Sequence, residues 1–417
     1  MVEQPDPTET EAQSVARTIL AVQGIRAALY GFGSVVLGEA LAAEGLSAAA
    51  VGGVFAAMLV GMAAGTIAVG RWGDAFGRRR AYGALLLVMG GAGTVFALTS
   101  WVPALVLAAI TGTLSTDPNE SGPITTLEQA MLSGVPAAIR VRVFGRYNAV
   151  AYLAGSFGAL VAGGPSILRR VVPALPADQR WLLFFPVLAV ACAALTRRLP
   201  ARFDVQRDRH VRGLQRSRRQ VRRLSVLFGI DAFGGGFVVQ SFMVYWFHQR
   251  FAASVGLMGL VFFVVGLLQA GSSLAATSVS RRIGLLNTMV FTHLPSNLLL
   301  VAVALVPTLP LAIAALLARS ALSQMDVPAR QGYIAALVDP DELTAAAAST
   351  NTARYAVRPL GPLIAGGLMQ GVLAGPFIAA GGIKIVYDLI LFATFRRAAV
   401  GPEVPAAGDT GDQVEKR

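Results

Sequence analysis

The chain has 417 residues, of which 55% are hydrophobic and only 14% are charged. Soluble proteins carry about 25% charged residues, so this composition excludes an ordinary water-soluble protein and indicates a chain that folds in lipid. The net charge of +12 would suggest nucleic-acid binding in a soluble chain, but here the arginines lie in short gaps between apolar runs. The single cysteine, Cys192, excludes an intramolecular disulfide and a cysteine-based metal site, and we expect no cofactor.

Apolar runs long enough to cross a bilayer recur along the whole chain. A helix needs about 20 apolar residues to span the hydrocarbon core. We expect twelve spans, at residues 17–40, 48–70, 81–100, 102–126, 144–166, 181–198, 224–247, 255–279, 287–306, 309–334, 345–370 and 376–395. The predicted fold class is therefore an all-α membrane protein with about twelve transmembrane helices.

Arginine placement predicts how these helices are oriented, because positive charge gathers in cytoplasmic loops. The loops that we assign to the inside contain Arg71, Arg78, Arg79, Arg80, Arg140, Arg142, Arg146, Arg281, Arg282, Arg396 and Arg397. We therefore expect both termini in the cytoplasm. Lysine occurs only at Lys384 and Lys416, which we interpret as the codon bias of a high-GC bacterial genome, so we expect the protein in a bacterial inner (plasma) membrane.

The loop after the second span combines glycines, one acid and several arginines. Gly70 and Gly77 permit a tight crossing between two helices. Asp74 can accept hydrogen bonds from a basic side chain or a helix N-terminus, while Arg78 and Arg79 hold the loop on the inside. The alternative is that the loop is only a topological anchor.

One charged residue lies inside the first span of each half of the chain, and the two residues have opposite charge. Arg26 lies about 14 Å into the first span, and Asp231 lies at a similar depth in the seventh. A charge in the bilayer costs at least a few kcal/mol, so intramembrane charges are candidates for function. The two could pair across a central cavity in one conformation, as a gate or a proton-sensitive site, or form a static salt bridge.

The fourth span contains Asp117 and Glu120 followed by Gly122 and Pro123, so its backbone is predicted to bend or break. Two carboxylates beside a broken helix suit the binding of a cation or a proton. The alternative is a shortened helix that leaves both acids near the inner surface.

Spans ten and eleven hold further charges. Arg319 and Asp326 in span ten are candidates for the cavity, with Arg319 the better anion contact. Arg330 lies nearer the inner surface, where snorkelling is the simpler interpretation. Arg354 and Arg358 share one face of span eleven and either close the inside gate or contact substrate. We interpret four further polar residues as structural: His293, Asn297, Lys384 and Asp388.

The two halves of the chain repeat each other. Residues 148–164 and 351–367 share Asn, Tyr, Gly, Leu and a closing Ala-Gly-Gly, and residues 24–32 echo residues 229–237. Because each half has an even number of spans, the repeat is parallel, about an axis along the membrane normal. An arginine-rich linker separates the halves, and it is read as a solvated cytoplasmic segment or, alternatively, a docking site. The predicted division is a tail at 1–16, a bundle at 17–198, the linker at 199–223, a bundle at 224–398 and a tail at 399–417.

The loop at residues 70–80 resembles the signature loop of the major facilitator superfamily, with Ala75 in place of a usual basic residue. A degenerate copy at 281–284 lacks the acid. The resemblance implies two pseudo-symmetric six-helix bundles that alternate about a central cavity, with Asp74 and Arg78 in an inside charge network. Residues 155–164 partly resemble the glycine-rich motif of drug antiporters, although small residues also simply allow close helix packing.

From the residues and the resemblance together we expect a secondary transporter of small molecules, proton-coupled and exporting, acting as a monomer in the bilayer. No nucleophile–base pair or phosphate-binding loop is present, so an enzyme or an ATP-driven pump is not expected. One alternative is an importer of an organic anion drawn to Arg26, Arg319 and Arg354. An alternative of another class is a non-transporting receptor or scaffold.

Overall fold

The computed structural model describes residues 7–115, 122–133, 137–176, 179–200, 214–339 and 342–396, and in these residues the regular structure is entirely helical. The helices of the N-terminal half are α1 (Pro7–Ala43), α2 (Ala48–Phe76), α3 (Arg78–Leu98), α4 (Val102–Ala109), α5 (Pro123–Leu132), α6 (Ala137–Val161), α7 (Gly164–Val171), η1 (Gln179–Leu183) and α8 (Phe184–Thr196). Those of the C-terminal half are α9 (Arg218–Gly236), α10 (Gln240–Phe251), α11 (Val255–Ile283), α12 (Leu285–Leu305), α13 (Leu309–Leu322), α14 (Asp326–Leu337), α15 (Leu343–Val357), α16 (Leu360–Gly371) and α17 (Gly375–Phe395).

These elements make twelve spans in two six-helix bundles, as predicted. Nine spans in the described part are helical stretches long and apolar enough to cross a membrane. The other three are each built from two shorter helices: α4 with α5, α13 with α14, and α15 with α16. The fourth span is interrupted as the sequence predicted, since Gly122 and Pro123 begin a new helix there.

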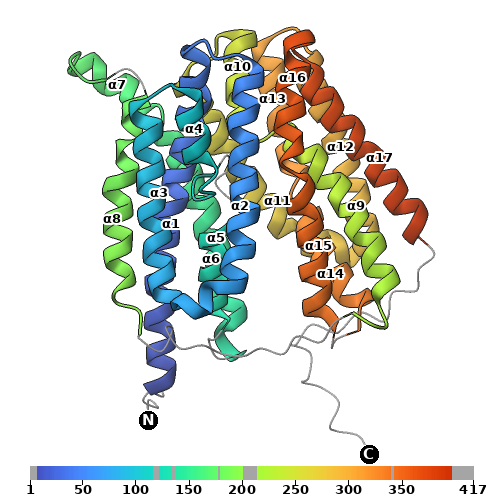
Figure 1. The fold of residues 1–417 in the computed structure, drawn as a ribbon. Coiled ribbons are helices and arrows are strands. Elements are labelled where there is room, and N and C mark those ends of the chain that lie inside the picture. Colours follow the sequence, from blue (N-terminus) through green and yellow to red (C-terminus); the bar gives the residue numbers. More distant parts are fainter. Residues whose placement is uncertain are drawn as a thin grey trace, which may run out of the picture.

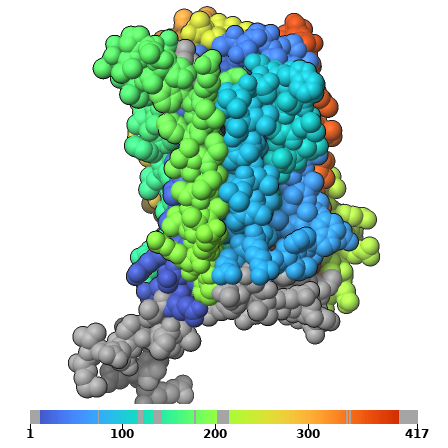
Figure 2. Space-filling model, turned by 60° about the vertical axis from the view of Figure 1, so that its left-hand side comes forward, coloured from blue at the N-terminus to red at the C-terminus, as the bar shows by residue number. Residues whose placement is uncertain are grey.

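The first and last helices begin and end toward the same end of the molecule, drawn lower in Figure 1. We call this the basic end, because the arginines at 71, 78–80, 281 and 282 lie there, and we call the other the opposite end. Figure 2 shows α8 and α3 packed side by side on the outer face of the N-terminal half. It also shows α7, none of whose residues is buried, projecting at the opposite end.

The two halves pack closely near the opposite end. The α2–α16 contact brings Gly52 against Pro362 and Gly366, and a side chain at either glycine would collide with the backbone of the other half. Between α6 and α11, a Cβ at Gly259 would lie 2.5 Å from the carbonyl oxygen of Ala159, and a Cβ at Gly163, just after α6, would lie 2.9 Å from the Cα atom of Gly256. Glycine is therefore required where the bundles meet, since only a residue without Cβ permits this approach.

Hydrogen bonds join the halves at the same end. Gln240 donates to Ser34 Oγ at 2.8 Å, and the Tyr245 hydroxyl donates to the carbonyl of Leu46 at 3.0 Å. The His248 ring lies 2.9 Å from the Glu39 carboxylate. The two bundles are thus held together by hydrogen bonds at the opposite end.

Each half turns sharply between its second and third spans. Gly77 begins α3 with a φ of 81°, and Gly284 begins α12 with a φ of 84°. A side chain is strained at such positive φ values, which explains glycine at both positions. The degenerate copy of the loop therefore keeps the backbone conformation of the first loop although it lacks the acid.

Candidate functional site

A buried ion pair lies at the centre of the N-terminal half. Arg26 of α1 is 2% exposed, and its guanidinium lies 2.7 Å from a carboxylate oxygen of Glu128 on α5, which is fully buried. The hydroxyls of Tyr82 and Tyr147 donate to the same carboxylate at 2.7 and 2.5 Å. Gln23, one turn before Arg26, accepts a hydrogen bond from the guanidinium. The pair is therefore neutralised and fully hydrogen-bonded, as a buried charge must be.

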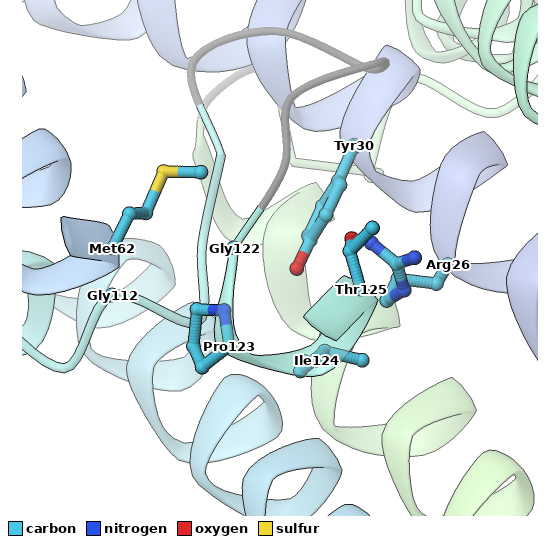
Figure 3. A pocket seen from close by; sticks show the side chains of 8 residues that line it. All are labelled: Arg26, Tyr30, Met62, Gly112, Gly122, Pro123, Ile124 and Thr125. Atoms are coloured by element: carbon cyan, nitrogen blue, oxygen red, sulfur yellow. The ribbon is translucent and has the colours of Figure 1, made fainter. Parts of the chain in front are cut away.

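Beside this pair lies a narrow crevice (Figure 3) that leaves no room for a water-sized sphere. Arg26 and Tyr30 of α1 face Thr125 of α5 there, and Pro123 and Met62 line the other side. The guanidinium carbon of Arg26 stands 5.2 Å from the Tyr30 ring centroid, a cation–π distance. The crevice is too narrow for a small organic molecule in this conformation.

The C-terminal half contains a second buried cluster, centred on Asp231 of α9, which is 4% exposed. One carboxylate oxygen accepts a 2.5 Å hydrogen bond from the ammonium of Lys384 on α17. The other lies 3.5 Å from the guanidinium of Arg330 on α14, which also lies 3.3 Å from Asp326 one turn earlier. Two buried cations thus surround one central carboxylate.

A histidine extends this cluster toward α12. The Nε2 atom of His293 is 3.8 Å from Asp231, and its Nδ1 atom is 2.8 Å from Asp388 of α17. The amide of Asn297 donates to Asp388 at 2.9 Å. The histidine thus connects Asp231 and Asp388 within one buried cluster.

The two clusters have opposite polarity at repeat-related positions. The first span supplies the cation in one half, Arg26, and the carboxylate in the other, Asp231. The fourth span of each half supplies the partner, Glu128 and Arg330. In this structure the pairing that we considered between Arg26 and Asp231 is therefore not formed, since each binds within its own bundle.

One interpretation from the sequence is corrected by these contacts. Arg330 does not snorkel to the surface: it is 8% exposed and bound to two carboxylates. Lys384, His293 and Asp388, which we interpreted as structural, are part of the Asp231 cluster. Glu128, the central acid of the other cluster, was missed because the predicted fourth span ended at residue 126, whereas α5 continues to Leu132.

The remaining predicted cavity residues are spread over the molecule. Arg319 is half-buried in the last turn of α13, and its carbonyl accepts a hydrogen bond from Ser296 at 3.3 Å. Arg354 is half-buried in the last turn of α15, and Arg358 is the residue that ends this helix. Asp117 and Glu120 lie outside the described residues.

Residues of the loop at 70–80 bind within their own half. Arg78 donates to the carbonyl of Ala130 near the end of α5, and Arg79 donates to the carbonyl of Leu199 after α8, both at 3.3 Å. These arginines thus cap the ends of neighbouring helices at the basic end. Gly70 has open space around it, and the side chain of Asp74 lies outside the described part.

Chemically, the two clusters offer buried carboxylates, a histidine and cations, but no arrangement typical of a metal site. In the described residues no group of three or more His, Cys, Asp or Glu side chains is placed to hold a metal ion. The Asp231 cluster holds three acids, two cations and a titratable ring in one connected network. Such a network can accept or release a proton when a partner moves.

The family model of the Major Facilitator Superfamily matches residues 19–362. Among curated proteins, the chain is 25% identical over 365 residues to YJR124C, an uncharacterised membrane protein of Saccharomyces cerevisiae. The match covers 78% of this chain and 81% of the yeast protein.

Solved transporter structures are similar over almost their whole length. The nucleoside transporter NupG has a TM-score of 0.73 at 13% identity, covering 92% of this chain and 99% of that chain. A bacterial homologue of the human lysosomal transporter Spinster, inward-facing and occupied, has a TM-score of 0.70 at 14% identity, covering 94% and 98%. A D-xylose–proton symporter has a TM-score of 0.63 at 15% identity, covering 93% and 98%. At such identities the similarity shows the fold alone.

Proposed function

The chain belongs to the Major Facilitator Superfamily, a family of membrane transporters and not of enzymes, and from this premise we propose that it is a proton-coupled carrier that exports a small molecule by alternating access. The observation that carries the proposal is the Asp231 cluster. Asp231 is 4% exposed inside a membrane helix, bound to Lys384 and within reach of His293 and Arg330, and buried ionisable groups of this kind mark substrate and proton pathways in membrane proteins.

The mechanism follows from competition for one carboxylate. Movement of Lys384 or Arg330 to another partner would remove the cations that keep Asp231 ionised, and the carboxylate would then be free to take up a proton. Because α9, α14 and α17 each supply one of these residues, the change would alter how the helices of this half pack. A proton and a conformational step are thereby linked.

The direction of transport that we propose is export. Export is favoured by the glycine-rich stretch of span five, which packs against the other half through Gly163. With the termini in the cytoplasm, as we propose from the arginine pattern, the halves contact each other at the extracellular end and substrate would enter from inside.

The coupling is tested with purified protein in proteoliposomes. A panel of labelled organic anions, zwitterions and cationic dyes is screened for flux driven by an imposed pH gradient. We expect Asp231→Asn to abolish the pH-driven component, while Glu44→Gln, an exposed acid at the opposite end, leaves it unchanged. If Asp231→Asn transports at the original rate across the same gradient, Asp231 has no role in coupling.

Import of an organic anion is the second candidate, favoured by the half-buried Arg354 near the Asp231 cluster. Uptake of labelled anions into intact cells, set against efflux from preloaded cells, distinguishes the two directions. A non-transporting scaffold predicts that positions between the halves react with thiol reagents from one side only under every condition, on a Cys192-free background.

A further inference from the structure

A groove of about 720 Å³ runs between α9 and α15, on the side of α9 away from the Asp231 cluster. Its floor is formed by small residues: Ser225 and Ser349 touch through their hydroxyls at 3.2 Å, and Gly229 faces Ala353. The complete lining is Leu214, Arg218, Arg222, Ser225, Val226, Gly229, Ile230, Phe233, Ser349, Ala353, Ala356, Val357 and Leu360.

The groove opens sideways, toward the surroundings of the bundle. In Figure 1, α15, α9 and α17 follow one another across the face turned to the viewer, and α9 packs against both neighbours. Asp231 points into the bundle, whereas Val226 on the groove side is 59% exposed and Leu360 is 49% exposed. Because the chain spans a membrane, the groove faces lipid and not water.

Positive charge is confined to one end of the groove. Arg218 and Arg222 are exposed at the basic end, and in the described residues neither has a hydrogen-bond or ion-pair partner. The nearby acids are already engaged: Asp339 binds Arg216 at 3.1 Å, and Glu342 accepts hydrogen bonds from the backbone of residues 215–217. The rest of the lining is apolar or small.

The length of the apolar part matches one leaflet of a bilayer. From Arg222 to Phe233 the helix rises about 16 Å at 1.5 Å per residue. Half of a hydrocarbon core of about 30 Å is about 15 Å. A molecule with an anionic head beside the arginines and an apolar chain of one leaflet's length therefore fits the groove in both charge and reach.

We propose that this groove binds an anionic phospholipid from the leaflet at the basic end. Its phosphate lies between Arg218 and Arg222, and one acyl chain lies along Val226, Ile230 and Phe233. The lipid braces α9 against α15, the two helices whose other faces carry Asp231 and Arg354. The proposal concerns binding only and stands independently of the transported substrate and of proton coupling.

The test uses the full chain purified in a non-ionic detergent. Phosphatidylglycerol, phosphatidylcholine and inorganic phosphate are titrated separately, and thermal unfolding and lipid adducts in native mass spectra are recorded. We expect phosphatidylglycerol to raise Tm and to form adducts at lower concentrations than phosphatidylcholine, and inorganic phosphate to do neither. Arg218→Gln/Arg222→Gln should need about 30-fold more phosphatidylglycerol, at about tenfold per 1.4 kcal/mol and about 1 kcal/mol per arginine.

Matched variants distinguish lipid binding in the groove from attraction of the lipid to surface charge in general. Arg281→Gln/Arg282→Gln removes two exposed arginines of the same end that do not line the groove, and it should leave the titration unchanged. Val226→Trp fills the groove without touching a charge and should weaken binding, whereas Leu274→Trp, at an 80% exposed position of α11, should not. The proposal would be overturned if both lipids raised Tm equally, or if inorganic phosphate raised Tm as much as phosphatidylglycerol. It would also be overturned if both double arginine variants lost the same affinity for phosphatidylglycerol.

Discussion

At the scale of single residues, two buried charges, Arg26 and Asp231, each form ion pairs inside their own bundle. Arg26 and Glu128 are separated by 102 positions in the chain, yet they lie 2.7 Å apart with both side chains nearly free of solvent contact. Two tyrosine hydroxyls complete the hydrogen bonding of the carboxylate. Such a pair is neutral as a unit, but either member alone is an uncompensated charge.

We therefore expect Glu128→Gln to destabilise the protein by about 3–5 kcal/mol, because it leaves Arg26 buried without a counter-charge. The measurement is unfolding by SDS in mixed micelles, with Arg26→Gln and the double variant completing a cycle. The double variant should lose clearly less stability than the two single losses combined. Simple additivity would show that the two residues do not interact energetically.

At the scale of elements, the segment that leads into α9 is hydrogen-bonded to the start of α15. The carboxylate of Glu342, just before α15, accepts hydrogen bonds from the backbone N–H groups of Gln215, Arg216 and Ser217, at 2.7 to 2.8 Å. These donors immediately precede α9, so the acid also faces the positive end of that helix. The arginine-rich linker thus ends in a fixed point on the bundle.

This contact predicts a defined pH dependence. The three backbone donors, of Ser217, Arg216 and Gln215, lower the pKa of Glu342 from 4.5 to about 2. A lowered folded-state pKa means that the stabilisation is complete above the unfolded value near 4.5 and is lost as the pH falls toward about 2. We expect wild type to have a higher Tm than Glu342→Gln at pH 7, with the gap narrowing through this interval. A gap that is constant from pH 7 to pH 3 would contradict the role of the charge.

At the scale of the whole molecule, the contacts between the bundles are concentrated near the opposite end. Glycines on α2, α11 and α16, and Gly163 just after α6, allow backbones to meet there, and the hydrogen bonds from Gln240, Tyr245 and His248 lie at the same level. The glycine-rich stretches of spans five and eleven thus lie at the interface between the halves. Small residues there give close packing that is also easy to separate, because few side chains interlock.

A bulky residue at this interface should shift the conformational equilibrium. A Cβ at Gly366 would collide with the backbone of Ala48 and Ala49, whereas the neighbouring Gly367 has open space. We expect Gly366→Val to separate the halves at the opposite end and Gly367→Val to leave them as they are. Spin labels at Glu44 and Val372, both exposed, on a Cys192→Ser background report the distance.

In that experiment the Gly366→Val sample should gain a longer distance at the opposite end. A second Gly366→Val sample carries its labels at Trp72 and Ala348, exposed positions of the two halves toward the basic end. These two labels should lie closer together than in the protein with Gly366. Identical distance distributions in both valine variants would show that the glycine contact does not control the equilibrium.

The sequence by itself determined the architecture of this protein. Spans of about 20 apolar residues, an arginine-rich centre and two echoing segments are local or periodic patterns, so they predict twelve helices in two bundles without knowledge of any contact. The break in span four was predictable for the same reason, since Gly122 and Pro123 act on the backbone at their own position.

Only the tertiary structure decided which charges meet. Helical spacing places a residue on a face of its own helix but does not say which helix packs there. Asp231 and Lys384 are 153 positions apart in the chain, and the sequence alone led us to interpret Lys384 as structural, with no indication of Asp231 as its partner. The packing of α9 against α17 brings Lys384 to Asp231. Both groups are buried, and the interior of a membrane has no water to solvate an unpaired charge, so the two charges must pair.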